Sequence, residues 1–111
     1  MSARAQARLW VAQRATAALL AFCVAVHLAT IIFAVRGGLT AAEILARTRG
    51  SVAWGAFYGI FVIAAAIHGG IGLRAVAIEW LGLRRTAGWV ATFAAAALVA
   101  LGLRAVVAVI A

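Results

Sequence analysis

Three long apolar runs organise the sequence, and most polar residues lie between them. The runs cover about residues 15–35, 52–77 and 87–109. A helix of roughly 20 apolar residues crosses a membrane core about 30 Å thick, so each run is long enough to span a membrane once. The pattern therefore predicts an all-α fold, a transmembrane bundle of three helices that forms a single membrane domain over residues 1–111.

The connection between the first two runs carries the signal for a short helix. Thr40 and Glu43 have the T-x-x-E spacing of a capping box, in which each side chain accepts a hydrogen bond from the backbone N–H of the other residue. We therefore expect a short interfacial helix from about Ala41 to Thr48, ended by Gly50.

The composition supports a membrane protein and argues against a soluble one. Hydrophobic residues make up 68% of the chain, and the net charge of +8 comes from ten arginines and two glutamates, with no lysine. Most of the arginines flank the apolar runs, which suits contact with membrane lipid. Nucleic-acid binding requires a contiguous basic face on a folded surface, so we expect no nucleic-acid partner. The single cysteine, Cys23, lies in the first run and is expected to be a small buried hydrophobic side chain.

The arginines also predict the orientation of the helices. By the positive-inside rule the end with more arginines faces the cytoplasm, which places the N-terminus inside and the C-terminus outside. We expect a bacterial inner (plasma) membrane. The mitochondrial inner membrane is the alternative, because residues 1–13 contain arginine and no acid, as presequences do. The two sets are Arg4, Arg8, Arg14, Arg74, Arg84 and Arg85 at the first end, and Arg36, Arg47, Arg49 and Arg104 at the other.

Two histidines lie within the predicted spans and are the candidates for chemistry. An ionisable residue in a membrane span is costly to bury, and a neutral imidazole is a common axial ligand of haem iron. His68 lies in the second run among small residues that leave space for a flat ligand, and His27 lies in the first run. Counted from the nearest arginines, their depths differ by about 10 Å, so they do not share one haem unless the helices are strongly offset. Each needs a histidine from another chain, unless it only hydrogen-bonds a neighbouring helix.

Other residues of the second run predict contacts rather than chemistry. Trp54 and Tyr58, near its start, are expected to anchor the helix at the membrane interface. Gly55 and Gly59 form a GxxxG pattern, which permits close approach of two helices.

The sequence HGGIGLR and the acid that follows it resemble a family signature. The signature has a histidine, three residues, a glycine, a hydrophobic residue, an arginine and then an acid. In this chain these are His68, Gly72, Leu73, Arg74 and Glu79. The signature is that of the membrane-anchor cytochrome b subunit of succinate:quinone oxidoreductases, which comprise the succinate dehydrogenases and the related fumarate reductases.

The start of the first run resembles the same family. Residues 13–17, QRATA, are similar to the family's HR-x-[ST]-G pattern, match it at Arg14 and Thr16, and depart from it at the first and last positions. In the family these positions lie near the quinone head group, so the resemblance implies that Arg14 and Thr16 bind quinone. A further quinone-binding serine of the family corresponds to Trp10, which has no hydroxyl.

The resemblance implies an anchor subunit that holds a cofactor. His68 would be the axial ligand of haem b, with Gly72 beside it. Arg74 would hold the haem propionates, dock the iron–sulfur subunit or serve as a plain positive-inside arginine. His27 would bind a second haem, as in family members with haems at two depths. The partner ligands would come from a second membrane-anchor subunit or a second copy of this chain. An iron–sulfur subunit and a flavoprotein subunit would carry the dehydrogenase chemistry, and this chain would pass electrons to quinone.

Two other functions fit parts of the sequence. A haem-free helical membrane scaffold or assembly subunit would use both histidines only as hydrogen-bonding groups. A small multidrug-type transporter has about this length, but it needs four spans and an acid within the membrane. Here three spans are predicted, and Glu43 and Glu79 lie at or beyond their ends. A b-type absorption spectrum separates the anchor from the scaffold.

Overall fold

The computed structural model describes residues 1–111 and is entirely helical. Its three long helices are apolar enough to cross a membrane, and a short helix lies between the first two, as the hydrophobic pattern predicts. The elements are α1 (Ala3–Arg36), α2 (Ala41–Thr48), α3 (Val52–Glu79) and α4 (Ala87–Ile110).

Helix α1 begins well before the apolar run that predicted it. The hydroxyl of Ser2 caps its N-terminus by accepting a hydrogen bond from the backbone N–H of Ala5, at 3.2 Å. No glycine or proline interrupts the following residues, so the helix continues from its polar first turns into the apolar run. With 34 residues, α1 is about 51 Å long. Because this length exceeds the roughly 30 Å of a membrane core, α1 has turns that extend beyond it.

Helix α2 has the predicted bounds and the predicted cap. The side chain of Thr40 accepts from the backbone N–H of Glu43 at 3.2 Å, and the carboxylate of Glu43 accepts from the backbone N–H of Thr40 at 2.7 Å. The backbone N–H and the hydroxyl of Thr40 lower the pKa of the Glu43 carboxyl group below its ordinary value. Gly50, at φ +70°, follows the helix in a backbone conformation that glycine adopts without strain.

The segment from α2 to α3 also caps the C-terminal end of α4. The hydroxyl of Thr48 donates to the carbonyl oxygen of Val109, and the backbone N–H of Gly50 donates to the carbonyl oxygen of Ile110 at 2.9 Å. The last carbonyl groups of a helix have no partner inside that helix. This short connection therefore both satisfies the end of α4 and fixes the start of α3 beside it.

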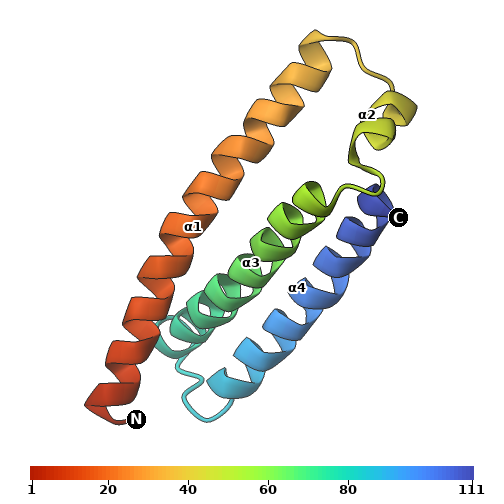
Figure 1. Ribbon diagram of the computed structural model, residues 1–111. Helices are drawn as coiled ribbons and strands as arrows, with labels where there is room; N and C mark the ends of the chain where they lie inside the picture. Colours follow the sequence, from red (N-terminus) through yellow and green to blue (C-terminus); the bar gives the residue numbers. More distant parts are fainter.

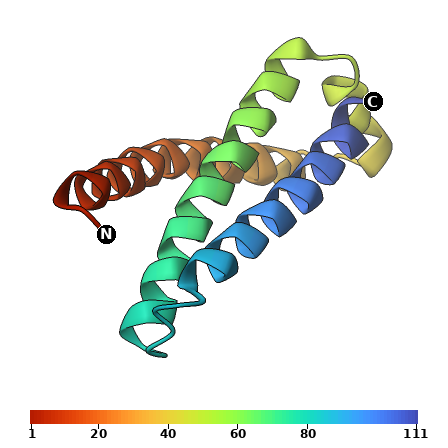
Figure 2. The ribbon, with the colours of Figure 1, turned by 90° about the horizontal axis from the view of Figure 1, so that it is seen from below.

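Helix α3 is the central element, with α1 and α4 on different sides of it (Figures 1 and 2). Helices α3 and α4 run side by side, whereas α1 crosses α3 at an angle, as Figure 2 shows. The N-terminus lies at the same end as the α3–α4 connection, and the C-terminus lies at the end with α2. The two sets of arginines therefore fall at opposite ends of the molecule, as predicted.

Small residues allow α3 and α4 to approach closely. A Cβ atom added to Gly102 would lie 2.5 Å from Cγ1 of Val62, and one added to Gly70 would lie 3.3 Å from the carbonyl oxygen of Ala91. The predicted GxxxG contributes only in part, because Gly55 faces Ile110 whereas nothing lies within 4 Å of a Cβ on Gly59.

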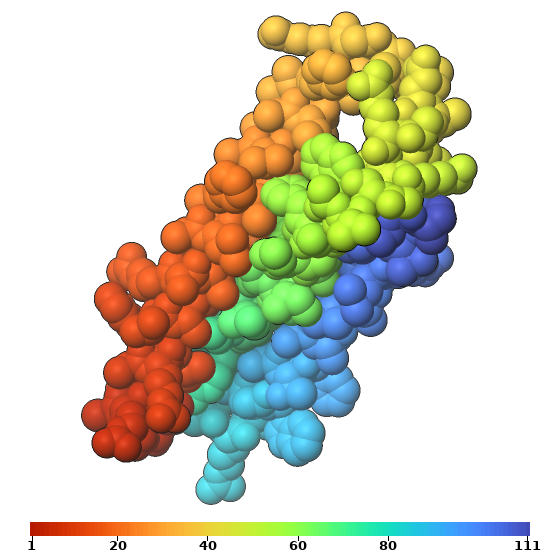
Figure 3. All heavy atoms as spheres, in the orientation of Figure 1, coloured from red at the N-terminus to blue at the C-terminus, as the bar shows by residue number.

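Most of the apolar surface is left uncovered by this chain. Only 7 of the 111 residues are buried, and Figure 3 shows α3 between α1 and α4, with α2 set apart from α1 by an opening. Cys23 is one of the buried residues, with 1% of its surface exposed, which confirms the prediction of a small buried hydrophobic side chain. The exposed apolar faces must therefore contact lipid or other membrane proteins.

We expect Gly102→Ala to destabilise the bundle, because the added methyl group strikes the branched, stiff side chain of Val62. Overpacking of this kind costs about 1–3 kcal/mol. The matched control is Gly88→Ala in the same helix, where nothing lies within 4 Å of the new Cβ. This control should be neutral or slightly stabilising, since alanine favours helix. Thermal unfolding in detergent, followed by circular dichroism, measures both variants. Equal unfolding temperatures would contradict the close α3–α4 crossing.

Candidate functional site

His68 lies in the second half of α3 and is paired with α1. Its Nδ1 atom is 3.2 Å from Oγ1 of Thr16, and both side chains are half-buried. The Thr16 hydroxyl is also 2.7 Å from the carbonyl oxygen of Ala12 and 3.2 Å from that of Gln13, within its own helix. Nε2 of His68 makes no hydrogen bond in the chain and is not enclosed, since the one buried polar side-chain atom without a partner is Oε1 of Gln13. His68 is thus held through one nitrogen while the other stays accessible.

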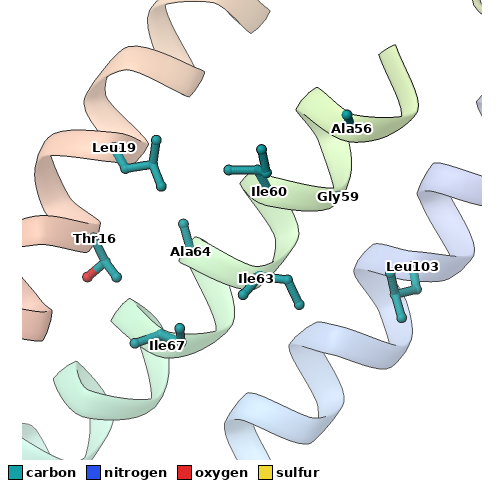
Figure 4. Close-up of a pocket in the computed structure, with 9 residues that line it drawn as sticks. All are labelled: Thr16, Leu19, Ala56, Gly59, Ile60, Ile63, Ala64, Ile67 and Leu103. Carbon is teal, nitrogen blue, oxygen red and sulfur yellow. The ribbon is translucent and has the colours of Figure 1, made fainter. Parts of the chain in front are cut away.

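An apolar groove runs along α3 between α1 and α4 and reaches Thr16, the partner of His68 (Figure 4). Its volume is about 480 Å³, which falls within the range of ligand pockets, roughly 300–1,000 Å³. Thr16 is the one polar side chain in its lining, so the groove reaches the hydroxyl that contacts His68. The lining residues are Thr16 and Leu19 of α1, Ala56, Gly59, Ile60, Ile63, Ala64 and Ile67 of α3, and Leu103 of α4.

The glycines after His68 serve contacts with both neighbouring helices. Cβ atoms on Gly69 and Gly70 would press on α4, and one on Gly72 would lie 3.4 Å from Nε2 of Gln13 in α1. Gly72 therefore makes room for the Gln13 carboxamide, one helical turn from His68. Oε1 of Gln13 is buried without a hydrogen-bond partner. A buried acceptor without a partner is costly. A water or a ligand hydroxyl would donate the missing hydrogen bond to Oε1, whereas an ionised carboxylate has no proton to donate.

His27 occupies a second, separate pair between the same helices. Its Nδ1 atom is 3.2 Å from the hydroxyl of Tyr58, and its ring makes edge contacts with Tyr58 and Phe61 at centroid distances of 5.5 and 5.9 Å. Tyr58 was expected to anchor α3 at the membrane interface, and its hydroxyl contacts His27. Tyr58 precedes His68 by ten residues in α3, so the two pairs lie about 15 Å apart along the helix. The two histidines therefore lie at different depths, as predicted, and their separation is somewhat larger than the predicted difference of about 10 Å.

The two predicted quinone-binding residues lie on opposite faces of α1. Arg14 and Thr16 are two positions apart, which is about 200° around a helix. Thr16 faces α3, whereas Arg14 is exposed and lies 5.3 Å from the ring centroid of Trp10. The structure therefore brings Thr16, but not Arg14, to His68.

Arg74 lies beyond His68 toward the end of α3 that is near the N-terminus. It is half-buried, and its Nη2 atom is 3.9 Å from the sulfur of Met1. Arg74 is six residues from His68, about 9 Å along the helix. Its guanidinium group therefore lies on the arginine-rich side of the histidine.

The sequence did not predict the roles of two residues near the histidines, Gln13 and Tyr58. Gln13 was noted only as a departure from a pattern, and Tyr58 only as an anchor. The signal for Gln13 is its spacing of three residues from Thr16, which puts both on the α3-facing side of α1. For Tyr58 no such local signal exists, because its partner His27 lies 31 residues away in another helix.

Comparisons with known proteins agree with the motif around His68. Neither curated proteins nor solved structures give a match to the chain. The family model described as the succinate dehydrogenase/fumarate reductase transmembrane subunit matches residues 1–109, which is nearly the whole chain. With its three membrane-length helices, this chain belongs to the family of transmembrane subunits that anchor succinate dehydrogenase and fumarate reductase complexes in the membrane.

Proposed function

We propose that this anchor subunit binds haem b through His68 and passes electrons between an iron–sulfur subunit and membrane quinone. The observation that carries the proposal is the state of the His68 side chain. Nδ1 is fixed to α1 by Thr16, whereas Nε2 makes no hydrogen bond in the chain and is not enclosed; an apolar groove reaches Thr16, the partner of Nδ1. An accessible imidazole nitrogen in a span is the ligand that haem iron requires.

The residues around His68 fit a haem by shape and charge. The groove is apolar, as a porphyrin ring requires, whereas the space beside Gly72 holds the Gln13 side chain. Arg74 carries a guanidinium group that would hold the propionates by charge-assisted hydrogen bonds. The other role for Arg74 is that of a plain positive-inside arginine. A bound haem would supply one-electron transfer, and this chain's residues would hold and orient it.

For quinone we propose the outer face of α1 near Arg14. The exposed guanidinium group over the Trp10 ring joins a cation with hydrogen-bond donors to a flat apolar surface. A quinone head group offers carbonyl oxygens and a flat ring, which match these two features. Thr16 lies on the other side of α1, and its hydroxyl is already engaged with His68 and with its own helix.

Partners and orientation follow from the charges and the uncovered surface. We place the arginine-rich end, with the N-terminus, in the cytoplasm of a bacterial cell, where the iron–sulfur and flavoprotein subunits would dock. A second membrane-anchor subunit or a second copy of this chain would cover the groove and supply the second axial histidine. Of the two predicted ligands we place the haem at His68, because the groove reaches its partner Thr16, whereas Tyr58 and Phe61, which contact His27, do not line it. A second haem at His27 stays a prediction.

A haem-free scaffold is the second candidate, because both histidines form hydrogen bonds between α1 and α3. His68→Ala separates the two functions. We expect the purified complex to show b-type absorption in the Soret region that is lost in His68→Ala and kept in His27→Ala, because the haem iron binds Nε2 of His68. The measurement is the haem-to-protein ratio together with the optical spectrum.

Co-purification of the hydrophilic subunits is the control that the His68→Ala complex still assembles. An unchanged spectrum in His68→Ala would remove the haem assignment, and a wild-type complex without Soret absorption would favour the scaffold. Loss of half the haem in each histidine variant would instead support two haems.

The groove can be tested without touching a histidine. Gly59→Leu adds a side chain to the lining, and nothing in this chain lies within 4 Å of the new Cβ, so the subunit itself should still fold. We expect lower haem content and weaker association with the second membrane subunit, measured by haem assay and by gel filtration of the detergent-solubilised complex. Gly88→Leu, at an equally open position in α4, is the control. Wild-type haem content and association in Gly59→Leu would show that the groove stays empty in the complex.

A further inference from the structure

The Thr16 hydroxyl has a single proton and three neighbours. Two of these are the carbonyl oxygens of Ala12, at 2.7 Å, and Gln13, at 3.2 Å, which can only accept hydrogen bonds. The third is Nδ1 of His68, at 3.2 Å. The shortest contact takes the proton to the Ala12 carbonyl, which leaves a lone pair of the Thr16 oxygen facing the imidazole.

An oxygen lone pair facing Nδ1 makes a hydrogen bond only if Nδ1 carries the proton. A neutral imidazole has one N–H, so a proton on Nδ1 leaves the lone pair on Nε2. The opposite tautomer would set two lone pairs against each other unless Thr16 gave up its bond to Ala12. From this geometry we infer that Thr16 is a positioning residue, which holds His68 in the tautomer whose Nε2 is ready to bind iron. This inference rests on the proposed role of His68 as a haem ligand.

The second histidine shows why this arrangement is specific. The hydroxyl of Tyr58 has no hydrogen-bond partner other than His27. It is therefore free to donate to Nδ1 or to accept from it, and the tautomer of His27 is not determined by its surroundings. Only at His68 does the helix backbone, acting through Thr16, select the ligating form.

The hydrogen bond also affects the strength of the ligand. A ligating imidazole that donates its other N–H is more basic and more firmly oriented, and loss of such a partner typically costs roughly 10- to 100-fold in metal affinity. Thr16→Val keeps the shape of the side chain and removes the acceptor. We expect haem affinity to fall within this range. The haem midpoint potential should shift to a more positive value, because a less basic ligand stabilises the oxidised iron less.

The test compares Thr16→Val with Thr16→Ser in the membrane complex. Valine keeps the volume of threonine and lacks the hydroxyl, whereas serine keeps the hydroxyl and lacks a methyl group. A positioning role predicts that Thr16→Ser resembles the wild type in haem content and midpoint potential and that Thr16→Val does not. A packing role predicts the reverse order. Thr92→Val is the matched control, because the Thr92 hydroxyl bonds only the carbonyl oxygen of Gly88 in its own helix.

The outcomes separate this inference from the proposed function. Suppose that the wild type binds haem, that His68→Ala loses it, and that Thr16→Val matches the wild type in haem content and midpoint potential. This result would overturn the inference about Thr16 and leave His68 as the haem ligand. A change in quinone KM alone, at unchanged potential, also overturns it and returns Thr16 to the quinone site. A wild type without haem overturns both. If Thr16→Val does not accumulate, Thr16→Ala against Thr16→Ser gives the same comparison, with the hydroxyl as the one difference.

Discussion

A polar side chain in a membrane span needs a hydrogen-bond partner within the protein, because lipid offers none. Helix α1 meets this constraint twice, by pairing Thr16 with His68 and His27 with Tyr58 of α3. Each such bond is worth about 0.6–2 kcal/mol. The two pairs lie about 15 Å apart along the helix, so together they fix both the rotation of α1 and its register against α3. That register brings Gln13 onto the turn after His68 and leaves Arg14 outside.

Helix α4 is attached to α3 by a different principle. Polar pairs are absent between them, and the contact instead depends on glycines that let the backbones approach, most tightly where Gly102 meets Val62. With α1 held on one side and α4 on another, a third face of α3 remains open as the apolar groove. A bundle with only 7 buried residues out of 111 leaves most of its apolar surface to lipid or to other membrane proteins, which is compatible with membership of a family of complex subunits.

Run length and capping chemistry predicted most of the fold, because both are local. The bounds of α2 follow from Thr40 and Glu43 alone, and the three long helices follow from apolar runs of sufficient length. Contacts between helices were harder to predict, since they depend on which faces meet. The glycine that makes the tightest contact is Gly102 rather than a member of the GxxxG pair, and the contact of Tyr58 with His27 joins residues 31 positions apart. Helical periodicity puts Arg14 and Thr16 on different faces of α1, although the family pattern groups them.

His68 joins the structural and the functional parts of the molecule because an imidazole has two nitrogens with separate tasks. A histidine that only braced α1 against α3 would need Nδ1 alone, and a scaffold could then enclose Nε2 or bond it to a neighbour. Here Nε2 is neither enclosed nor hydrogen-bonded, although the next turn of α3 is packed closely enough to bury Oε1 of Gln13. Bracing and ligation are therefore compatible, and the brace sets the direction in which the free nitrogen points. On the proposed function, one histidine would fill one axial position of a haem, so the opposite ligand would come from a second chain, for which the open face of α3 leaves room.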